Sequence, residues 1–560
     1  MKKIINIILL IVSFSLFSCN ESFLVEKPID FFSGDNAYKT LIDFNTSVNM
    51  LYSRVRTEFY TLNEKRPFDY IYGTDIVFDG QPSESSDRYS PMKTALAPTG
   101  GITADHWKGL YKIVSDANTI ITRLPASQLT ATQKLLIEAQ AKFFRAFAYR
   151  TLCYLYGGVP LVTAEVTAAK TDFIRATKAD VLALVTSDLE FSAANLPGIA
   201  SVKDGEISNL AAQHLLSEVY LAAGQYQKAV AAATIVIGDA NVSLMQNRFG
   251  SESTSNPGDV YYDLFRPGNQ NRKSGNKEGI WVIQFETDVN GGASVSTGQG
   301  GNYLLERNHA PMIRDLSIGG VSPFRWPVSD FTGGRGIGWA IPTVYFSDSI
   351  WKSDFTNDMR NSNCNFVRDF TANKTGTIYY GKIISTKNPP AGVTVPNRAF
   401  YAYQSKCTTP YHHPSSLISN AATFDLKSTA GGTYTDQYMF RLAETYLLRA
   451  EAYLGLGNTA NAATDINVVR ARAKASPVAP ANVTIDYILD ERMRELGVEE
   501  KRRLTLMRLG KLYDRVMKYN PYYAKMTDGM LPTYNLWPIP FSVIEANTGA
   551  VLEQNPGYNY

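Results

Sequence analysis

Residues 211–237 read AAQHLLSEVYLAAGQYQKAVAAATIVI, and residues 441–469 read RLAETYLLRAEAYLGLGNTANAATDINVV. Both segments contain the pattern Tyr-x3-Gly-x4-Ala. The matching residues are Tyr220, Gly224 and Ala229 in the first segment and Tyr453, Gly457 and Ala462 in the second. A glycine that can adopt a left-handed cap, followed by an alanine where two backbones approach, predicts a tetratricopeptide hairpin. Two copies also fit a generic helical hairpin. Because such hairpins bury their apolar faces by stacking, we expect a curved helical solenoid.

Further amphipathic segments extend this helical frame. Helices are predicted over 36–56, 107–124, 132–156, 178–195 and 484–518. The alternating charges of 490–518, with Glu499 and Arg503 four residues apart, are typical of a solvated helix face. The chain is therefore predicted to be mainly α.

Helical periodicity is lost between the two hairpins. The segment 241–433 holds 21 of the 40 glycines and four of the six tryptophans. Short alternating runs at 280–286 and 377–384 predict strands within it, separated by turns. We interpret it as a large, irregular, loop-rich insertion that faces a ligand, because loops on a rigid scaffold often carry recognition residues. The parts 19–240 and 434–560 are expected to pack together as one helical domain.

Composition excludes several classes of protein. The chain has 560 residues, 44% of them hydrophobic, which is enough for a large core and excludes disorder. Its 55 Lys and Arg nearly balance its 52 Asp and Glu, so binding to nucleic acid by phosphate neutralisation is not expected. Aromatic residues make up 12%, led by 33 tyrosines. This is a surplus of flat, amphipathic rings.

The first residues indicate export. Residues 1–18 combine two lysines with an apolar run too short to span a bilayer, as in a secretory signal. Residues 16–19, LFSC, resemble the lipobox of bacterial lipoproteins, which predicts acylation of Cys19 and attachment to a membrane through lipid alone. The alternative is an ordinary signal peptide that ends near a cysteine. The two models differ only in the anchor.

The other cysteines and the histidines show no metal pattern. Cys153 lies in an apolar helical stretch and is expected in the core, whereas Cys364 and Cys407 could pair or stay free. None of the five histidines has zinc-ligand spacing, so neither a metal nor another cofactor is predicted.

Several stretches resemble one family in the family's own order. They are HWKGLYKIVSDANTIITRLP at 106–125, IEAQAKFFRAFAYRTLCYLYGGVPLVT at 137–163, RLAETYLLRAEAYLGLG at 441–457 and NLWPIPFSVIEANTGAVLEQNPGY at 535–558. The start, CNESFLVEKP, and the Asn-x-Val-Arg-x-Arg-Ala run at 467–473 fit as well. The chain thereby resembles the SusD/RagB-like outer-membrane lipoproteins of nutrient uptake. It departs from their pattern at Val543, where an acidic residue is usual, and at Lys501, where histidine is usual.

The resemblance implies a binding protein rather than an enzyme. Similar proteins work with a SusC-like TonB-dependent transporter and capture oligosaccharides or, in some members, peptides. The expected place is the outer membrane, lipid-anchored and facing the cell exterior. No Gly-x-Ser-x-Gly elbow, His-Glu-x-x-His motif or phosphate-binding loop is present in the sequence, so catalysis finds no support in motifs. The alternatives are a peptide-binding member of the family, a helical scaffold for other envelope proteins, and a surface hydrolase.

Two loops supply the residues expected to bind a sugar. A sugar ring presents an apolar face and a polar rim, so its binders combine aromatic platforms with hydrogen-bonding side chains. The loop 67–92 and the segment 322–346 contain that mixture. The ligand-binding candidates are Tyr70, Tyr72, Asp87, Arg88 and Tyr89 in the first and Arg325, Trp326, Asp330, Arg335 and Trp339 in the second. Because most Trp and Tyr residues belong to the core, each ring could instead be structural.

Overall fold

The computed structural model describes residues 38–61, 66–82, 88–289, 291–296, 302–408 and 410–558. The predicted signal segment 1–18 and the predicted lipidation site Cys19 lie outside the described residues. Within the described part of the chain, no helix combines the length and the apolar character that crossing a bilayer requires.

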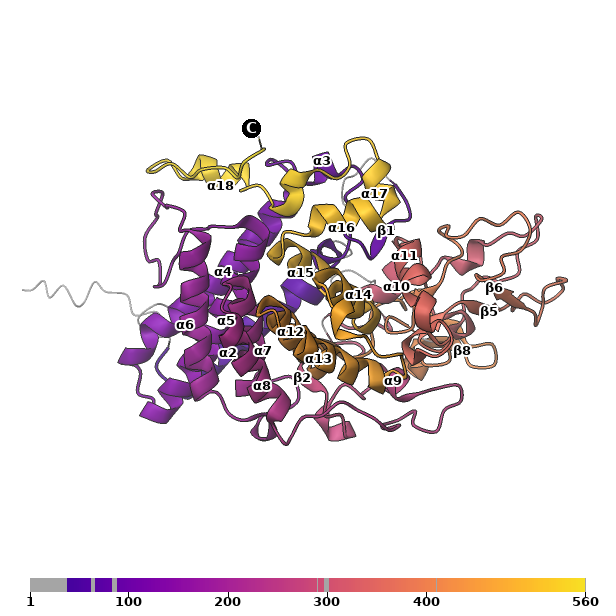
Figure 1. The fold of residues 1–560 in the computed structure, drawn as a ribbon, viewed down its shortest axis with the longest axis horizontal. Coiled ribbons are helices and arrows are strands. Elements are labelled where there is room, and N and C mark those ends of the chain that lie inside the picture. The colour runs from indigo at the N-terminus through magenta and orange to yellow at the C-terminus, as the bar shows by residue number, and fades with distance from the viewer. Residues whose placement is uncertain are drawn as a thin grey trace, which may run out of the picture.

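Helices dominate the N-terminal part, on the left of Figure 1. They are α2 (Leu41–Arg56), α4 (Gly101–Arg123), α5 (Ala131–Tyr156), α6 (Lys178–Asn195), α7 (Asn209–Ala222) and α8 (Tyr226–Gly238). Helices α2, α5 and α6 each begin with a capping box on Thr40, Thr130 or Thr177, which satisfies backbone amides of the first turn. From α4 to α8, each helix packs on the next. The predicted mainly α fold is confirmed.

Both predicted hairpins form. Gly224 and Gly457 adopt the left-handed conformation, with φ of 69° and 74°. Ala229 and Ala462 are completely buried at the approach of the paired helices. The second hairpin consists of α12 (Leu442–Gly455) and α13 (Thr459–Arg472).

The two hairpins also pack on each other. Helix α12 lies against α8 and α7, although more than 200 residues separate them. At Gly455 a methyl group would approach the Tyr226 ring to 2.6 Å, so the absence of a side chain permits this contact. The two ends of the chain therefore share one helical body.

The segment 484–518 is helical but interrupted. It forms α14 (Ile485–Glu495), α15 (Arg502–Arg508) and α16 (Leu512–Tyr519). The breaks fall at Gly497 and Gly510, whose positive φ values of 53° and 64° end a helix readily. The prediction of a solvated charged face is wrong here. Most of its charged side chains point inward instead, and those with at most 2% exposure are Glu491, Arg492, Glu495, Arg502, Arg503 and Arg515.

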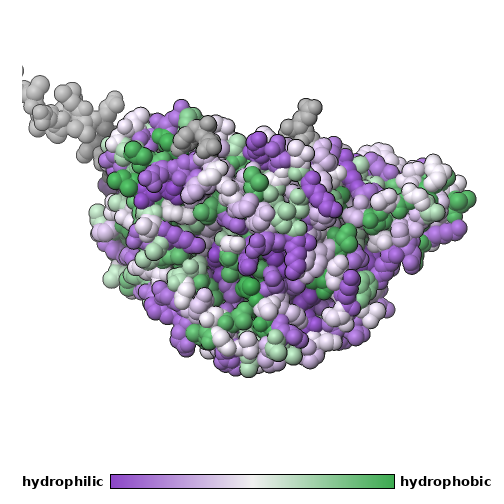
Figure 2. Space-filling model, turned by 45° about the horizontal axis from the view of Figure 1, so that its top comes forward, coloured by the Kyte–Doolittle hydropathy of each residue, from purple (hydrophilic) through white to green (hydrophobic). Residues whose placement is uncertain are grey.

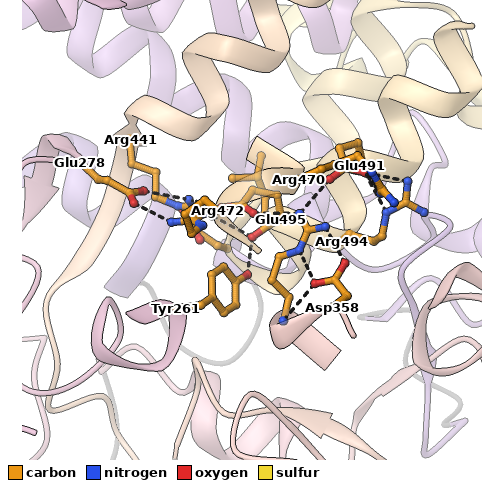
Figure 3. Close-up of polar contacts among 12 residues, drawn as sticks. Tyr261, Glu278, Asp358, Arg441, Arg470, Arg472, Glu491, Arg494 and Glu495 are labelled. Atoms are coloured by element: carbon orange, nitrogen blue, oxygen red, sulfur yellow. Dashed lines mark hydrogen bonds and ion pairs between the residues drawn. The ribbon is translucent and has the colours of Figure 1, made fainter. Parts of the chain in front are cut away.

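These charges are neutralised by partners from distant segments (Figure 3). Glu495 of α14 binds Arg472 of α13, Arg441 at 2.6 Å and Arg360 of the insertion at 3.0 Å. A carboxylate and three guanidinium groups can share one buried site because each charge has a close opposite charge. Burial alone would raise the pKa of Glu495, but the three arginines outweigh it and hold the pKa well below its ordinary value. The network ties the helical body to the insertion.

Sheet structure is limited to five two-stranded antiparallel pairs among the described residues. The pairs are β1 (Val77–Asp79) with β3 (Ala340–Pro342), β2 (Gly279–Ile283) with β10 (Gln437–Arg441), β4 (Phe366–Val367) with β7 (Tyr403–Gln404), β5 (Asp369–Thr371) with β6 (Ile383–Ser385), and β8 (Ile418–Asn420) with β9 (Asp425–Leu426). Short helices connect them and the tail. These are α3 (Met92–Ala95), α9 (Val260–Asp263), α10 (Leu305–His309), α11 (Val344–Ser347), α17 (Pro521–Lys525) and α18 (Phe541–Ala546).

The strand predicted at 280–286 is confirmed in its first residues and belongs to the core of the helical body. Trp281 of β2 packs edge-on against Phe143 and Phe147 of α5. Its indole N–H donates to the Gly205 carbonyl at 3.2 Å. A strand of the insertion therefore completes the helical core.

The strand predicted at 377–384 is largely wrong. Residues 377–382 form turns, in which Gly381 has a φ of 75°, and β6 starts only at Ile383. Together β5 and β6 form a hairpin in the part of the insertion at the right of Figure 1. Ile378 and Ile383 are 70% and 66% exposed there, and hydrophobic residues are visible at that end of the surface in Figure 2.

No disulfide joins the described cysteines. Cys153, Cys364 and Cys407 are all free. Cys153 is buried, as expected for a core residue. Cys364 lies beside Ser362 and Asp259, so it does not pair with Cys407.

Candidate functional site

The two loops expected to bind a ligand lie side by side. Strand β1 of the first loop pairs with β3 of the second, with Phe78 opposite Ile341 and Asp79 opposite Ala340. Beyond the last pair, the Gly80 N–H donates to the Trp339 carbonyl at 2.7 Å. A β ladder between segments far apart in sequence therefore assembles the site.

Trp339 stands where the ladder ends and is partly exposed. Its indole N–H donates to Oε1 of Gln81 at 2.8 Å. The guanidinium of Arg88 lies over the ring, 4.4 Å from its centroid, and its Nε also contacts Asp79 at 2.8 Å. A cation held on one face and a hydrogen bond at the edge fix the orientation of the ring.

Trp326 is the most exposed of the predicted rings, at 63%. The Arg314 guanidinium lies 4.9 Å from its centroid. The neighbouring Arg325 anchors the loop, because it forms an ion pair with Asp425 and donates to the Thr423 carbonyl at 2.7 Å. The ring is therefore accessible to a ligand.

Arg398 connects the turn before Trp339 with the segment that carries Arg314. Its Nε donates to the Ile337 carbonyl at 2.8 Å, and its own carbonyl accepts from the Met312 N–H at 3.1 Å. Gly338 has a φ of 65°, and a methyl group there would overlap the Arg398 carbonyl oxygen, so this close approach requires glycine. Burial lowers the pKa of Arg398; the nearby Asp315 carboxylate raises it, and the Arg88 and Arg314 guanidinium groups lower it further.

A buried charge cluster supports the loop from below. His413 lies between Asp330 and Glu306, with Nε2 2.7 Å from Glu306. Burial alone would lower the pKa of His413, but the two carboxylates outweigh it and raise the pKa to about 10. Glu306 also accepts the backbone N–H of Arg335 at 2.7 Å. The cluster therefore holds the glycine-rich turn that leads to Trp339.

The structure divides the predicted ligand residues into two groups. The first group is Arg88, Arg335, Trp326 and Trp339, which are at least partly exposed and make up the candidate face with Arg314 and Arg398. Arg335 donates to the carbonyls of Ser428 and Ala430. Arg325 and Asp330 lie behind this face as supports, since Arg325 is paired with Asp425 and Asp330 is 1% exposed. Asp87 lies outside the described residues.

The three tyrosines of the first loop require correction, because they pack in the core. Tyr70, Tyr72 and Tyr89 are at most 1% exposed. The hydroxyl of Tyr70 donates to Glu58 at 3.1 Å, and that of Tyr72 donates to Asn308 at 3.3 Å. None of the three rings offers a face to a ligand. The loop folds inward because its apolar rings complete the space beside α4 and α15.

Sequence reasoning missed Gln81, Arg314 and Arg398. Gln81 is within the proposed loop, and a hydrogen bond to Trp339 could have been considered for it. Arg314 and Arg398 come from segments without aromatic clusters, and the contacts to Trp326 and Ile337 that place them are long-range. The sequence feature that comes closest to indicating them is the set of glycines at 333–338, which is typical of a close approach between backbones.

Two cavities lie away from this face. One of about 720 Å³ lies between α6 and the turn from α7 to α8, and one of about 750 Å³ lies beside α2 and β2. Neither is lined by Trp326 or Trp339. Among the described residues, no group of His, Cys, Asp and Glu has the geometry of a metal site. The site thus offers flat rings and guanidinium donors on an open face.

Family models match most of the chain. The model described as "SusD family" matches residues 277–558, and the one described as "Starch-binding associating with outer membrane" matches residues 31–221. Among curated proteins, SusD-like protein P25 of Formosa agariphila is 25% identical over 99% of this chain and 100% of its own length. Starch-binding protein SusD of Bacteroides thetaiotaomicron is 36% identical over 24% of each chain.

Solved structures share the fold. A laminarin-binding SusD-like protein has a TM-score of 0.68 at 22% identity, covering 93% of this chain and 100% of its own. Surface glycan-binding protein A of Bacteroides thetaiotaomicron, solved with laminarihexaose, has a TM-score of 0.66 at 19% identity, covering 91% and 98%. With a family model spanning residues 277–558 and the same fold in these structures, the chain belongs to the SusD family.

Proposed function

We propose that this protein captures an oligosaccharide at the outer membrane and passes it to a partner TonB-dependent transporter. The observation that carries the proposal is the exposed Trp326 ring, on the same assembled face as Trp339 and its arginines. An aromatic ring backed by a cation presents its other face to the apolar C–H side of a sugar, while guanidinium N–H groups reach hydroxyl groups at the rim. The relatives described as starch-binding and laminarin-binding support the same ligand class.

No bond-breaking step is part of this proposal. The carboxylates beside the rings already have cationic partners, since Asp79 binds Arg88, Asp425 binds Arg325, and Asp330 binds His413. The protein holds its ligand unchanged. Incubation with bound oligosaccharide should therefore release no new reducing ends.

The ligand site is tested with Trp326→Ala and Trp339→Ala in the mature chain. Loss of a stacking ring should weaken binding about 5- to 30-fold, corresponding to about 1–2 kcal/mol. Calorimetry against a panel of oligosaccharides and peptides measures it. Ile235→Ala, which removes an exposed apolar side chain from α8, is the matched control. Peptide binding that depends on the same rings would instead support a peptide-binding member, and no ligand at all would support a scaffold.

The anchor and the partner need separate experiments. Cys19→Ser should release the protein from the membrane fraction, because acyl chains supply the attachment. Protease added to intact cells should digest the wild-type chain if it faces outward. Affinity purification from membranes should recover a TonB-dependent transporter.

A further inference from the structure

The candidate face gathers more positive charge than a neutral sugar requires. Four arginines contribute to it from four different segments, namely Arg88, Arg314, Arg335 and Arg398. Burial and the nearby Arg307 and Arg314 lower the pKa of Arg335, and they outweigh Glu306, which raises it. Like charges placed this close repel each other, so a site of this kind is stabilised when an anion binds.

The acidic residues nearby neutralise only part of this face. Asp79 forms an ion pair with Arg88, and Asp315 forms one with Arg314 at 3.5 Å. Asp330 and Glu306 both contact His413, whose raised pKa of about 10 keeps it protonated at neutral pH. Among the described residues, no ion pair joins Arg335 or Arg398 to a carboxylate.

Backbone carbonyls hold those two arginines. Arg398 donates one N–H to Ile337, and Arg335 donates from one nitrogen to Ser428 and Ala430. A guanidinium has five N–H donors, so each keeps donors for a further acceptor. Both side chains are partly exposed. Such groups are positioned without being neutralised, which suits bidentate recognition of a carboxylate or sulfate.

The sequence on both sides of Arg398 also contains more basic than acidic residues. From Thr371 to Phe424 the chain contains no Asp or Glu, while it contains Lys374, Lys382, Lys387, Arg398 and Lys406. This stretch supplies Arg398, strand β6 and the turn between β5 and β6, where the Lys374 N–H donates to the Pro323 carbonyl three residues before Trp326. The segment bearing Trp326 therefore borders a part of the chain without acidic residues.

We propose that the ligand is an acidic oligosaccharide, whose anionic groups are bound by Arg398 and Arg314 while its rings stack on Trp326 and Trp339. This inference rests on the proposed function and adds the substrate class. Uronic acids and sulfate esters both present the oxygen anions that a guanidinium binds. A neutral glucan would leave Arg335 and Arg398 without an ionic partner.

The test compares acidic with neutral oligosaccharides on the mature chain. Calorimetry uses oligogalacturonate as the uronic acid, a sulfated galactan oligosaccharide as the sulfate ester, and laminari- and malto-oligosaccharides as neutral ligands. We expect at least one acidic ligand to bind, about tenfold more weakly in Arg398→Gln and Arg314→Gln and more weakly at high salt. Which acidic ligand binds identifies the source of the anion. Arg398→Lys, which keeps the charge but loses the planar fork, should recover part of the affinity.

Arg272→Gln is the matched control, since Arg272 is also partly exposed and donates to a backbone carbonyl, that of Asn241. Melting temperatures establish that each variant is folded. Neutral ligands bound in preference, with no effect of salt or of the arginine variants, would overturn the acidic class while leaving the proposed function standing. Binding of no oligosaccharide, or binding unaffected by Trp326→Ala, would overturn the proposed function itself.

Discussion

The Arg88 guanidinium lies 4.4 Å from the centroid of the Trp339 ring, so a residue of the first loop covers the aromatic residue of the second. The same arginine is paired with Asp79, which is opposite Ala340 in the β1–β3 ladder. The ring, the cation and the carboxylate thereby form one unit. The orientation of Trp339 depends on both loops being in place.

The contact between Arg88 and Trp339 should be measurable as a coupling energy. A double-mutant cycle with Arg88→Gln and Trp339→Leu should give about 0.5–2 kcal/mol, the range for a cation on an indole face. Urea unfolding measures the free energies. Arg54→Gln combined with Trp339→Leu is the control, because Arg54 pairs with Asp116 on the helical frame. Additive single variants at positions 88 and 339 would contradict the proposed unit.

Removing the central carboxylate of the buried network should be strongly destabilising. Glu495→Gln leaves Arg360, Arg441 and Arg472 with one fewer opposite charge in the core. We expect unfolding to become easier by about 3–5 kcal/mol, as for broken buried ion pairs. Denaturant unfolding of the mature chain measures it.

The control for that loss is a pair near the surface. Glu138→Gln removes the partner of Lys142, which lies 2.7 Å away with both side chains partly exposed. Such a pair contributes at most about 1 kcal/mol. Equal effects of the two substitutions would show that the network is not the stabilising element described here.

Stability should fall in alkaline solution because of His106. It lies between Glu58 and Asp69, and their carboxylates outweigh burial and raise its pKa from 6.5 to about 9. A raised folded-state pKa means that the protonated form stabilises the fold. This contribution is complete below pH 6.5 and is lost as the pH rises through about 9.

Melting temperatures across that pH window test the assignment, with His106→Gln expected to flatten the decline. His309→Gln is the control, since burial lowers the pKa of His309 to about 4 and it stays neutral throughout the window. Its effect should be the same at every pH there. A His106→Gln variant with the wild-type pH profile would assign the alkaline loss to other groups, of which His413 is the first to examine.

Gly338→Ala should disturb both the fold and the site. The new methyl group would overlap the Arg398 carbonyl, and the φ of 65° adds strain for any residue with a side chain. We expect a loss of more than about 2 kcal/mol in unfolding free energy and weaker ligand binding, because Arg398 must move.

Gly392→Ala separates these two effects. Gly392 also has a positive φ, of 78°, but no atom lies within 4 Å of the added methyl group. Its cost should be limited to about 1–2 kcal/mol of backbone strain, with ligand binding unchanged. If both variants behaved alike, the close approach at Arg398 would have no energetic role.

Local patterns were sufficient for most of the frame. Helix periodicity, threonine caps and the glycines at 224 and 457 act over a few residues, so the helices and both hairpins could be predicted. The burial of the charges on α14 and α15 could not be predicted in this way. Glu495 pairs with Arg441 and Arg502 pairs with Asp75, and these partners are distant in sequence.

The candidate site shows the same division. Composition and loop content pointed to the stretches that carry Arg88, Trp326 and Trp339, because surplus aromatic and polar residues are visible in the sequence. Which rings are exposed was not visible there. Tyr70 and Trp326 look alike as residues in loops, but Tyr70 fills a gap beside α4 whereas Trp326 is left outside the core.

By itself, the sequence determined the helical hairpins, the loop-rich insertion and the family, because these depend on residue type and short spacing. Only the tertiary structure decided that the segments with Arg314, Arg398 and the two tryptophans meet, and that most charges of 490–518 lie inside. Those outcomes depend on contacts between segments far apart in the chain, where burial and charge pairing are settled only when the segments meet.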